Sequence, residues 1–138
     1  MEILYQTAVT SSGGRVGEAH SEEGRLAVQL SMPAGLGGPG GLGTNPEQLF
    51  AAGYSACFLS ALGYVAAQYH HQLPDSSTVT ALVGIGEVAT GFNLRVTLRI
   101  SLPGMERHDA LQLIDRAHQL CPYSNATRGN IHVDLLLL

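Results

Sequence analysis

The sequence has no lysine, and charged residues make up only 13% of its 138 residues. Without lysine, the chain can form neither a P-loop nor a lysine Schiff base. Its seven basic residues, all arginine, stand against eleven acidic ones, for a net charge of -4. Because such a chain lacks the basic surface that neutralises phosphates, we expect no nucleic-acid partner. Apolar residues reach 45%, enough for a core, and we expect one domain over residues 1–138.

Signal-peptide features are also missing, since the first residues form neither a basic segment nor an apolar one. We therefore expect a cytoplasmic protein. The sequence has just two cysteines, Cys57 and Cys121. In a reducing compartment, a thiol pair is more often redox-active or metal-binding than structural. These residues alone leave open whether the two cysteines meet.

The hydrophobic pattern predicts strands grouped around two helices. The expected helices cover residues 46–69 and 106–120, and the expected strands cover residues 3–10, 15–20, 26–31, 78–89, 92–102 and 131–138. Apolar residues that alternate along 92–102 predict one inward face, made of Phe92, Leu94, Val96, Leu98, Ile100 and Leu102. The order βββ-α-ββ-α-β indicates an α+β fold, with antiparallel sheets around a central apolar helix.

The central helix begins at Asn45-Pro46-Glu47, where an N-cap, a first-turn proline and a first-turn acid follow one another. From Leu49 to Ala67 it carries no charge and has no clear polar face. That length would suit a membrane span, but glycine, serine and six alanines make transfer into lipid weak. We therefore expect a buried helix and no membrane partner. Its small residues would let another helix, from a second copy of the chain, approach closely.

Three further patterns have simpler interpretations. Residues 35–40 match GxGxxG, but no strand leads directly into a helix there, so we expect a close-packed or mobile loop. Ser55 lies in a near match to the hydrolase GxSxG motif, but mid-helix, where a packing role is expected. The histidines at 70–71 and His118, three residues before Cys121, do not fit a zinc spacing, so we expect surface histidines and no metal.

The two cysteines lie in long, distinctive segments. Cys57 lies in TNPEQLFAAGYSACF (44–58), and Cys121 lies in AHQLCPYSNATRGN (117–130). Both segments resemble the cysteine motifs of the organic hydroperoxide resistance proteins, a branch of the osmotically inducible protein C superfamily. Shorter matches at residues 13–15, 35–43, 83–87 and 104–107 extend the resemblance over essentially the whole chain. The tyrosine in Cys-Pro-Tyr-Ser-Asn makes this motif resemble that of the hydroperoxide resistance branch more than that of the osmotically inducible branch.

The resemblance implies a thiol peroxidase that reduces organic hydroperoxides to alcohols. By the same resemblance, Cys57 is the peroxidatic thiol, Cys121 the resolving thiol, Arg15 the contact of the thiolate and Glu47 the acid that holds Arg15. It also implies an intertwined homodimer with active sites at the subunit interface and no bound cofactor. The implied reductant is an external dithiol, a dihydrolipoyl protein that lipoamide dehydrogenase keeps reduced. His132 stands where the family often has an acid.

These residue types suit the implied chemistry. The thiolate is the nucleophile, and burial would raise the pKa of Cys57, whereas a guanidinium favours the thiolate and keeps its own charge. Taken without the resemblance, Arg15 would be a surface turn residue and Glu47 an acid near a helix N-terminus. Two alternatives remain: a redox sensor whose disulfide changes a surface, and a hydrogen peroxide scavenger of the sister branch.

Overall fold

The computed structural model describes all residues from Met1 to Leu138, and they divide into two compact units, Met1–Leu49 and Phe50–Leu138. The first unit contains an antiparallel sheet of order β1-β2-β3, formed by Val9–Ser12, Glu18–Ser21 and Ala27–Gln29. It also has two 3-10 turns, η1 (Gly14–Val16) and η2 (Ala34–Leu36). The three strands that precede the central helix are therefore present as expected.

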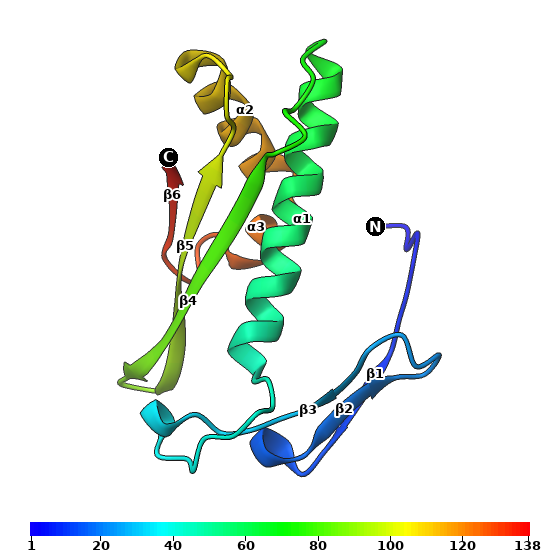
Figure 1. The fold of residues 1–138 in the computed structure, drawn as a ribbon, viewed down its shortest axis with the longest axis vertical. Coiled ribbons are helices and arrows are strands. Elements are labelled where there is room, and N and C mark those ends of the chain that lie inside the picture. The colour runs from blue at the N-terminus through cyan, green and yellow to red at the C-terminus, as the bar shows by residue number, and fades with distance from the viewer. The chain divides into compact units, whose positions relative to one another are not determined.

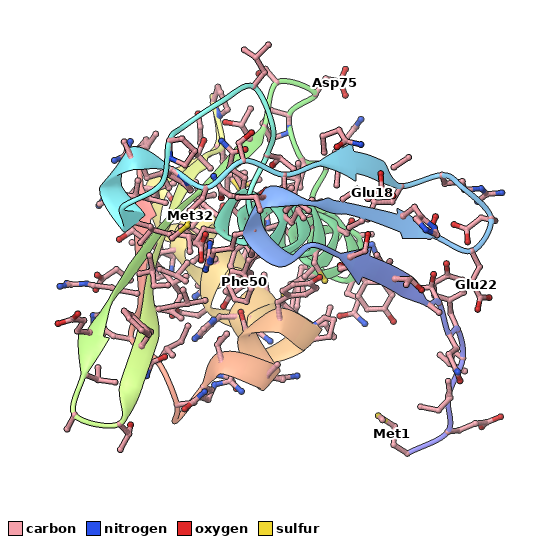
Figure 2. The ribbon with its side chains drawn as sticks, turned by 90° about the horizontal axis from the view of Figure 1, so that it is seen from below. Met1, Glu18, Glu22, Met32, Phe50 and Asp75 are labelled. Carbon is pink, nitrogen blue, oxygen red and sulfur yellow. The ribbon has the colours of Figure 1, made fainter.

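Strand boundaries in the first unit differ from the sequence prediction. β1 begins at Val9 rather than Ile3, and residues 1–8 continue beyond it as an extended arm with Met1 at its tip (Figure 2). The β1–β2 ladder runs only from Val9↔Ser21 to Ser12↔Glu18, because β2 has no further residues to pair with β1. Arg15, predicted to start a strand, lies in η1 instead. Strand-forming residues without a partner strand do not make a ladder.

The second unit holds most of the helical structure. Helix α1 (Pro46–Gln68) begins in the last residues of the first unit, and the strands β4 (Thr78–Val88) and β5 (Gly91–Ser101) follow as a hairpin. After them come α2 (Arg107–Leu120), the short α3 (Pro122–Thr127) and β6 (Val133–Leu137) (Figure 1). The α+β order is confirmed. However, β6 pairs in parallel with β5, because the connection through α2 and α3 returns the chain in the same direction.

The core of the second unit lies between one face of β5 and the helices. Val96, Leu98 and Ile100 are fully buried there and belong to one cluster with residues of α1 and α2. Burying each such side chain stabilises the fold by about 1.5–3 kcal/mol. The predicted inward face of β5 is thus confirmed along this stretch. It is wrong at Phe92, which is 69% exposed, because the strand begins at the hairpin turn, outside the core.

Helix α1 begins where the sequence predicts, with the Gln48 backbone N–H donating to Asn45 Oδ1 at 2.8 Å. Only one face of α1 is buried within the chain. Its buried residues are Tyr54, Phe58, Ala61, Leu62, Val65 and Ala66. Ala52, Ala56, Ser60 and Tyr64 are exposed on the rest of its surface. By length and composition alone α1 could cross a membrane, a property that core helices of soluble proteins share. The expectation of a helix buried all round is therefore not met within this chain.

The close packing of α3 against α1 depends on Gly53. A Cβ atom at Gly53 would lie 2.6 Å from the hydroxyl oxygen of Tyr123 and 3.0 Å from its Cζ atom. The Tyr123 ring in turn lies 5.6 Å from the Tyr54 ring and 6.1 Å from the Phe50 ring, between centroids. Phe50 and Tyr54 also meet edge to face, with 6.0 Å between centroids. The missing side chain at Gly53 thus makes room for the ring of Tyr123 in this aromatic cluster.

This packing can be tested with a double-mutant cycle on Gly53→Ala and Tyr123→Ala. With Tyr123→Ala already present, Gly53→Ala should raise the free energy of unfolding by about 0.5–1 kcal/mol, because alanine favours a helix over glycine. With Tyr123 present, the new methyl group meets the phenol, and that gain should vanish or reverse. Urea denaturation of the four proteins at one protein concentration measures both effects. If Gly53→Ala raised the free energy of unfolding equally with and without Tyr123, the Tyr123 ring would not be what excludes a side chain at position 53.

Candidate redox site

Cys57 and Cys121 come together in the second unit. Cys57 lies in the middle of α1 and is half-buried, whereas Cys121 lies between α2 and α3 and is fully buried. Both are free thiols, and the Cys121 thiol lies close enough to Cys57 to raise the pKa of the Cys57 thiol. The backbone of Tyr123 also lies close enough to Cys57 to lower the pKa of this thiol. The structure thus brings the two cysteines together, a point that the residues alone left open.

Pro122 explains why the chain presents Cys121 at this point. The Cys121 backbone N–H donates to the Ala117 carbonyl at 2.8 Å and completes the last turn of α2. A residue before proline disfavours helical dihedral angles, and Cys121 is extended, with φ -60° and ψ 122°. Proline is well suited to the first position of a new helix, and α3 starts at Pro122. Cys-Pro-Tyr therefore forms a corner between two helices, and the Tyr123 backbone in this corner lies near Cys57.

The surroundings of Cys57 in the second unit favour its neutral thiol. Burial raises the pKa of Cys57, and the neighbouring Cys121 thiol raises it further. The Tyr123 amide acts in the opposite direction, because its hydrogen bond stabilises the thiolate, but it does not outweigh the other two causes. A pKa shifted in this direction leaves little thiolate at neutral pH. Reaction as a nucleophile therefore calls for a positive charge in addition to these groups.

Arg15 and Glu47 form a separate ion pair within the first unit. The two carboxylate oxygens of Glu47 accept from Nη1 and Nη2 of Arg15 at 2.8 and 2.7 Å. This hydrogen bonding raises the pKa of Arg15 and lowers that of Glu47, so both groups stay charged at neutral pH. A guanidinium has five N–H groups, and Arg15 donates only two of them in hydrogen bonds. The others are available to a further acceptor.

Glycines shape the turn that carries Arg15. Gly13 and Gly14 have φ angles of 71° and 59°, in the left-handed region that disfavours other residues. A Cβ atom on Gly17 would lie 1.8 Å from the Ser12 carbonyl oxygen. The chain therefore closes tightly on itself around Arg15. Glu47 belongs to the first turn of α1, where its charge also interacts favourably with the helix N-terminus.

The other sequence patterns have structural roles. In the glycine-rich loop, a Cβ atom at Gly38 would lie 2.3 Å from the Met32 carbonyl oxygen, so the loop is close-packed at this point, whereas Gly35 and Gly37 face open space. Ser55 donates to the Ala52 carbonyl within α1 at 3.3 Å, in keeping with a helix-packing serine. No group of three or more histidine, cysteine or acidic side chains is arranged to hold a metal ion.

Sequence reasoning missed a set of polar side chains beside the cysteines. His118, expected on the surface, is half-buried because it lies next to the buried face of α2, and its Nδ1 lies 2.8 Å from Ser124 Oγ. Ser124 Oγ in turn lies 2.9 Å from the Tyr54 hydroxyl, and both residues are fully buried. The spacing offered a signal, since Tyr54 precedes Cys57 by three residues and Ser124 follows Cys121 by three.

Comparison with known proteins gives a consistent answer. A family model described as OsmC-like protein matches residues 38–136. The organic hydroperoxide resistance protein of Xanthomonas axonopodis pv. citri is 53% identical over 136 residues, covering 99% of this chain and 96% of that protein. Among solved structures, an organic hydroperoxide resistance protein from Elizabethkingia anophelis is 48% identical with a TM-score of 0.94, covering 99% of this chain and 98% of that chain.

The organic hydroperoxide resistance protein OhrB of Bacillus subtilis has the same fold, with a TM-score of 0.89 and 41% identity. That match covers 99% of this chain and all of the Bacillus chain (100%). The similarity therefore spans the strands, the helices and both cysteine segments. The chain belongs to the OsmC-like family, in its branch of organic hydroperoxide resistance proteins.

Proposed function

We propose that this protein is a cysteine-based peroxidase that reduces organic hydroperoxides to alcohols. The observation that carries the proposal is the direct neighbourhood of the Cys57 and Cys121 thiols in a half-buried site. Two neighbouring thiols can together lose two electrons and form one disulfide. The names of the relatives, which are organic hydroperoxide resistance proteins, support the choice of substrate.

The reaction runs in two steps. The Cys57 thiolate attacks one oxygen of the hydroperoxide, the O–O bond breaks, and the alkoxide takes up a proton and leaves as an alcohol. Cys57 then carries a sulfenic acid. In the second step, the Cys121 sulfur attacks the Cys57 sulfur, an S–S bond forms, and the sulfenic oxygen leaves as water. Because Cys121 is already adjacent, this second step protects Cys57 from further, irreversible oxidation.

Arg15 is proposed to supply the positive charge that favours the Cys57 thiolate. Burial and Cys121 hold the pKa of Cys57 high, and a nearby guanidinium would lower it without any risk of losing its own proton. Glu47 would orient the guanidinium through the bidentate pair and leave its other N–H groups free. In this scheme the catalytic residues are Cys57, Cys121 and Arg15, and Glu47 is a positioning residue.

The disulfide must be reduced again before a second turnover. We propose an external dithiol for this step, of the dihydrolipoyl type, which attacks the Cys57–Cys121 bond and leaves as its own disulfide. A lipoylated protein kept reduced by lipoamide dehydrogenase would serve in the cytoplasm. The protein itself would then need no bound cofactor.

Steady-state turnover with dihydrolipoamide as reductant tests the function. We expect many turnovers per protein, and faster reduction of cumene hydroperoxide than of hydrogen peroxide. Consumption that stops after one equivalent of peroxide, with reductant still present, would indicate a redox sensor. Equal rates on the small and the bulky peroxide would favour a general hydrogen peroxide scavenger.

The role of Arg15 is tested by Arg15→Ala. Loss of the guanidinium should raise the pKa of Cys57, and the rate of peroxide reduction at neutral pH should fall about 100-fold or more because little thiolate remains. Thiolate absorbance against pH measures the first effect, and stopped-flow kinetics measures the second. Arg25→Ala removes an exposed arginine of the same unit and should change neither. An unchanged Cys57 pKa in Arg15→Ala would remove Arg15 from the surroundings of the thiolate.

A homodimer is the remaining part of the proposal. The uncharged stretch of α1 is exposed on the side that carries Ala52, Ala56 and Ser60. Large apolar side chains in the first unit, among them Ile3, Leu4 and Tyr5, are also exposed. Apolar surface of this kind is typical of an interface, and a second copy of the chain would cover it.

Sedimentation velocity tests the dimer. We expect a dimer at micromolar concentration, and we expect Ser60→Arg to shift it toward monomer, because a charge would be buried against the second copy. Gln68→Arg, near the end of the same helix, serves as the matched control and should leave the dimer intact. A monomeric wild-type protein at this concentration would contradict the proposal.

A further inference from the structure

A chain of buried hydroxyl groups lies beside the two cysteines. We call Tyr54, Ser124 and Thr127 the hydroxyl chain; none of the three is more than 6% exposed. The Tyr54 oxygen lies 2.9 Å from Ser124 Oγ and 3.2 Å from Thr127 Oγ1. At one end, Thr127 donates to the carbonyls of Tyr123 and Ser124, at 2.9 and 3.1 Å. At the other end, Ser124 Oγ lies 2.8 Å from Nδ1 of His118.

Counting protons along the chain fixes the state of His118. Three hydroxyl groups supply three protons, and the proton of Thr127 goes to backbone carbonyls. Tyr54 must then donate to Thr127, and Ser124 must donate to Tyr54. The fourth link, between Ser124 and His118, has no hydroxyl proton left, so Nδ1 of His118 has to donate. If Nδ1 accepted the Ser124 proton instead, one of the buried oxygen–oxygen contacts in the hydroxyl chain would have no proton between its two oxygens, which is unfavourable.

The surroundings of the His118 imidazole favour its neutral form. Burial lowers the pKa of His118, and the nearby charge of Arg128 lowers it further, which outweighs the opposite effect of Asp115. A neutral ring that donates from Nδ1 leaves Nε2 unprotonated. Arg128 also donates to the His118 carbonyl at 2.5 Å and to the Asn125 side chain at 2.7 Å. These bonds connect the end of α2 to α3.

The hydroxyl chain connects the same elements that carry the thiols. Tyr54 lies one helical turn before Cys57 on α1, and Ser124 lies one turn after Cys121, in α3. His118 lies one turn before Cys121, at the end of α2. The hydrogen bonds of Tyr54 with Ser124 and Thr127, and of Ser124 with His118, therefore hold the corner between α2 and α3 against α1, one helical turn from the cysteines.

We propose that His118, donating from Nδ1 through the hydroxyl chain, is a positioning residue that keeps Cys121 in place to close the disulfide on Cys57. This inference rests on the proposed function, and it adds a residue outside the four that the family resemblance implies. His118 makes no bond to either sulfur; it acts through Ser124 and Tyr54. Its loss would slow the second step of the cycle, in which Cys121 attacks the Cys57 sulfenic acid.

The protonation state can be tested without any reaction. Long-range 1H–15N correlation spectra of the reduced wild-type protein, recorded well above the ordinary imidazole pKa, distinguish the two neutral tautomers of each histidine. We expect His118 to carry its proton on Nδ1, and His118→Asn identifies its signals by their loss. A proton on Nε2 would overturn the proposal.

Two amide variants test the positioning role. His118→Asn places an amide N–H near the position of Nδ1 and should restore the bond to Ser124, whereas His118→Gln places its amide further out. After one equivalent of tert-butyl hydroperoxide, quenched-flow trapping with dimedone measures the lifetime of the Cys57 sulfenic acid. We expect a lifetime about tenfold longer in His118→Gln than in wild type, and near the wild-type value in His118→Asn. Equal lifetimes in all three proteins would overturn the proposal.

Failure of this inference can be told from failure of the proposed function. A wild-type protein that forms no sulfenic acid or disulfide with peroxide would contradict the function, whereas the histidine tautomer would still be measurable. Thermal unfolding of both variants checks that they are folded. If neither variant folds, the position of the His118 proton in the wild-type protein still tests the proposal, and a proton on Nε2 would overturn it.

Discussion

The contact between the start of α3 and the middle of α1 is the constraint on which the site depends. Gly53 leaves room for the Tyr123 ring, and this packing places α3 close enough for the Tyr123 backbone to lower the pKa of Cys57. Cys121, two residues earlier, is brought to the same sulfur. A larger side chain at Gly53 would move the ring, and with it the corner that carries Cys121. The glycine and the tyrosine of the two cysteine segments thus have one shared explanation.

The two units differ in their chemical contributions. The second unit brings the thiols together in a half-buried setting, which raises the pKa of Cys57 and favours the neutral thiol. In the first unit, two hydrogen bonds to the Glu47 carboxylate fix the Arg15 guanidinium, whose other N–H groups are not used in this pair. A nucleophilic cysteine that is partly buried needs a nearby positive charge, because burial alone favours the neutral thiol. The proposed peroxidase combines these two contributions.

Much of the fold follows from local sequence patterns. Asn45-Pro46-Glu47 begins α1, and the alternation from Val96 to Ile100 identifies the buried face of β5, since both depend on neighbouring residues alone. The parallel pairing of β6 could not be read from local patterns, because it depends on how the chain returns through α2 and α3. The exposure of Phe92 likewise depends on where the core ends.

The site was predictable in part. Cys57 and Cys121 came from motif resemblance, whereas the hydrogen bonds that connect Tyr54, Ser124 and His118 depend on three helices meeting. A lone tyrosine, serine or histidine in a sequence gives no sign of such a meeting. Spacing of three residues from a cysteine becomes informative only once both cysteines are known to share a site.

The central claim is that Cys57 and Cys121 form one two-electron redox centre. The most direct test is intact mass and free-thiol count after the reduced protein meets one equivalent of tert-butyl hydroperoxide. We expect loss of both thiols, a mass lower by two hydrogens, and a Cys57–Cys121 bridge in the peptide map. A folded protein that keeps both thiols after this treatment would contradict it.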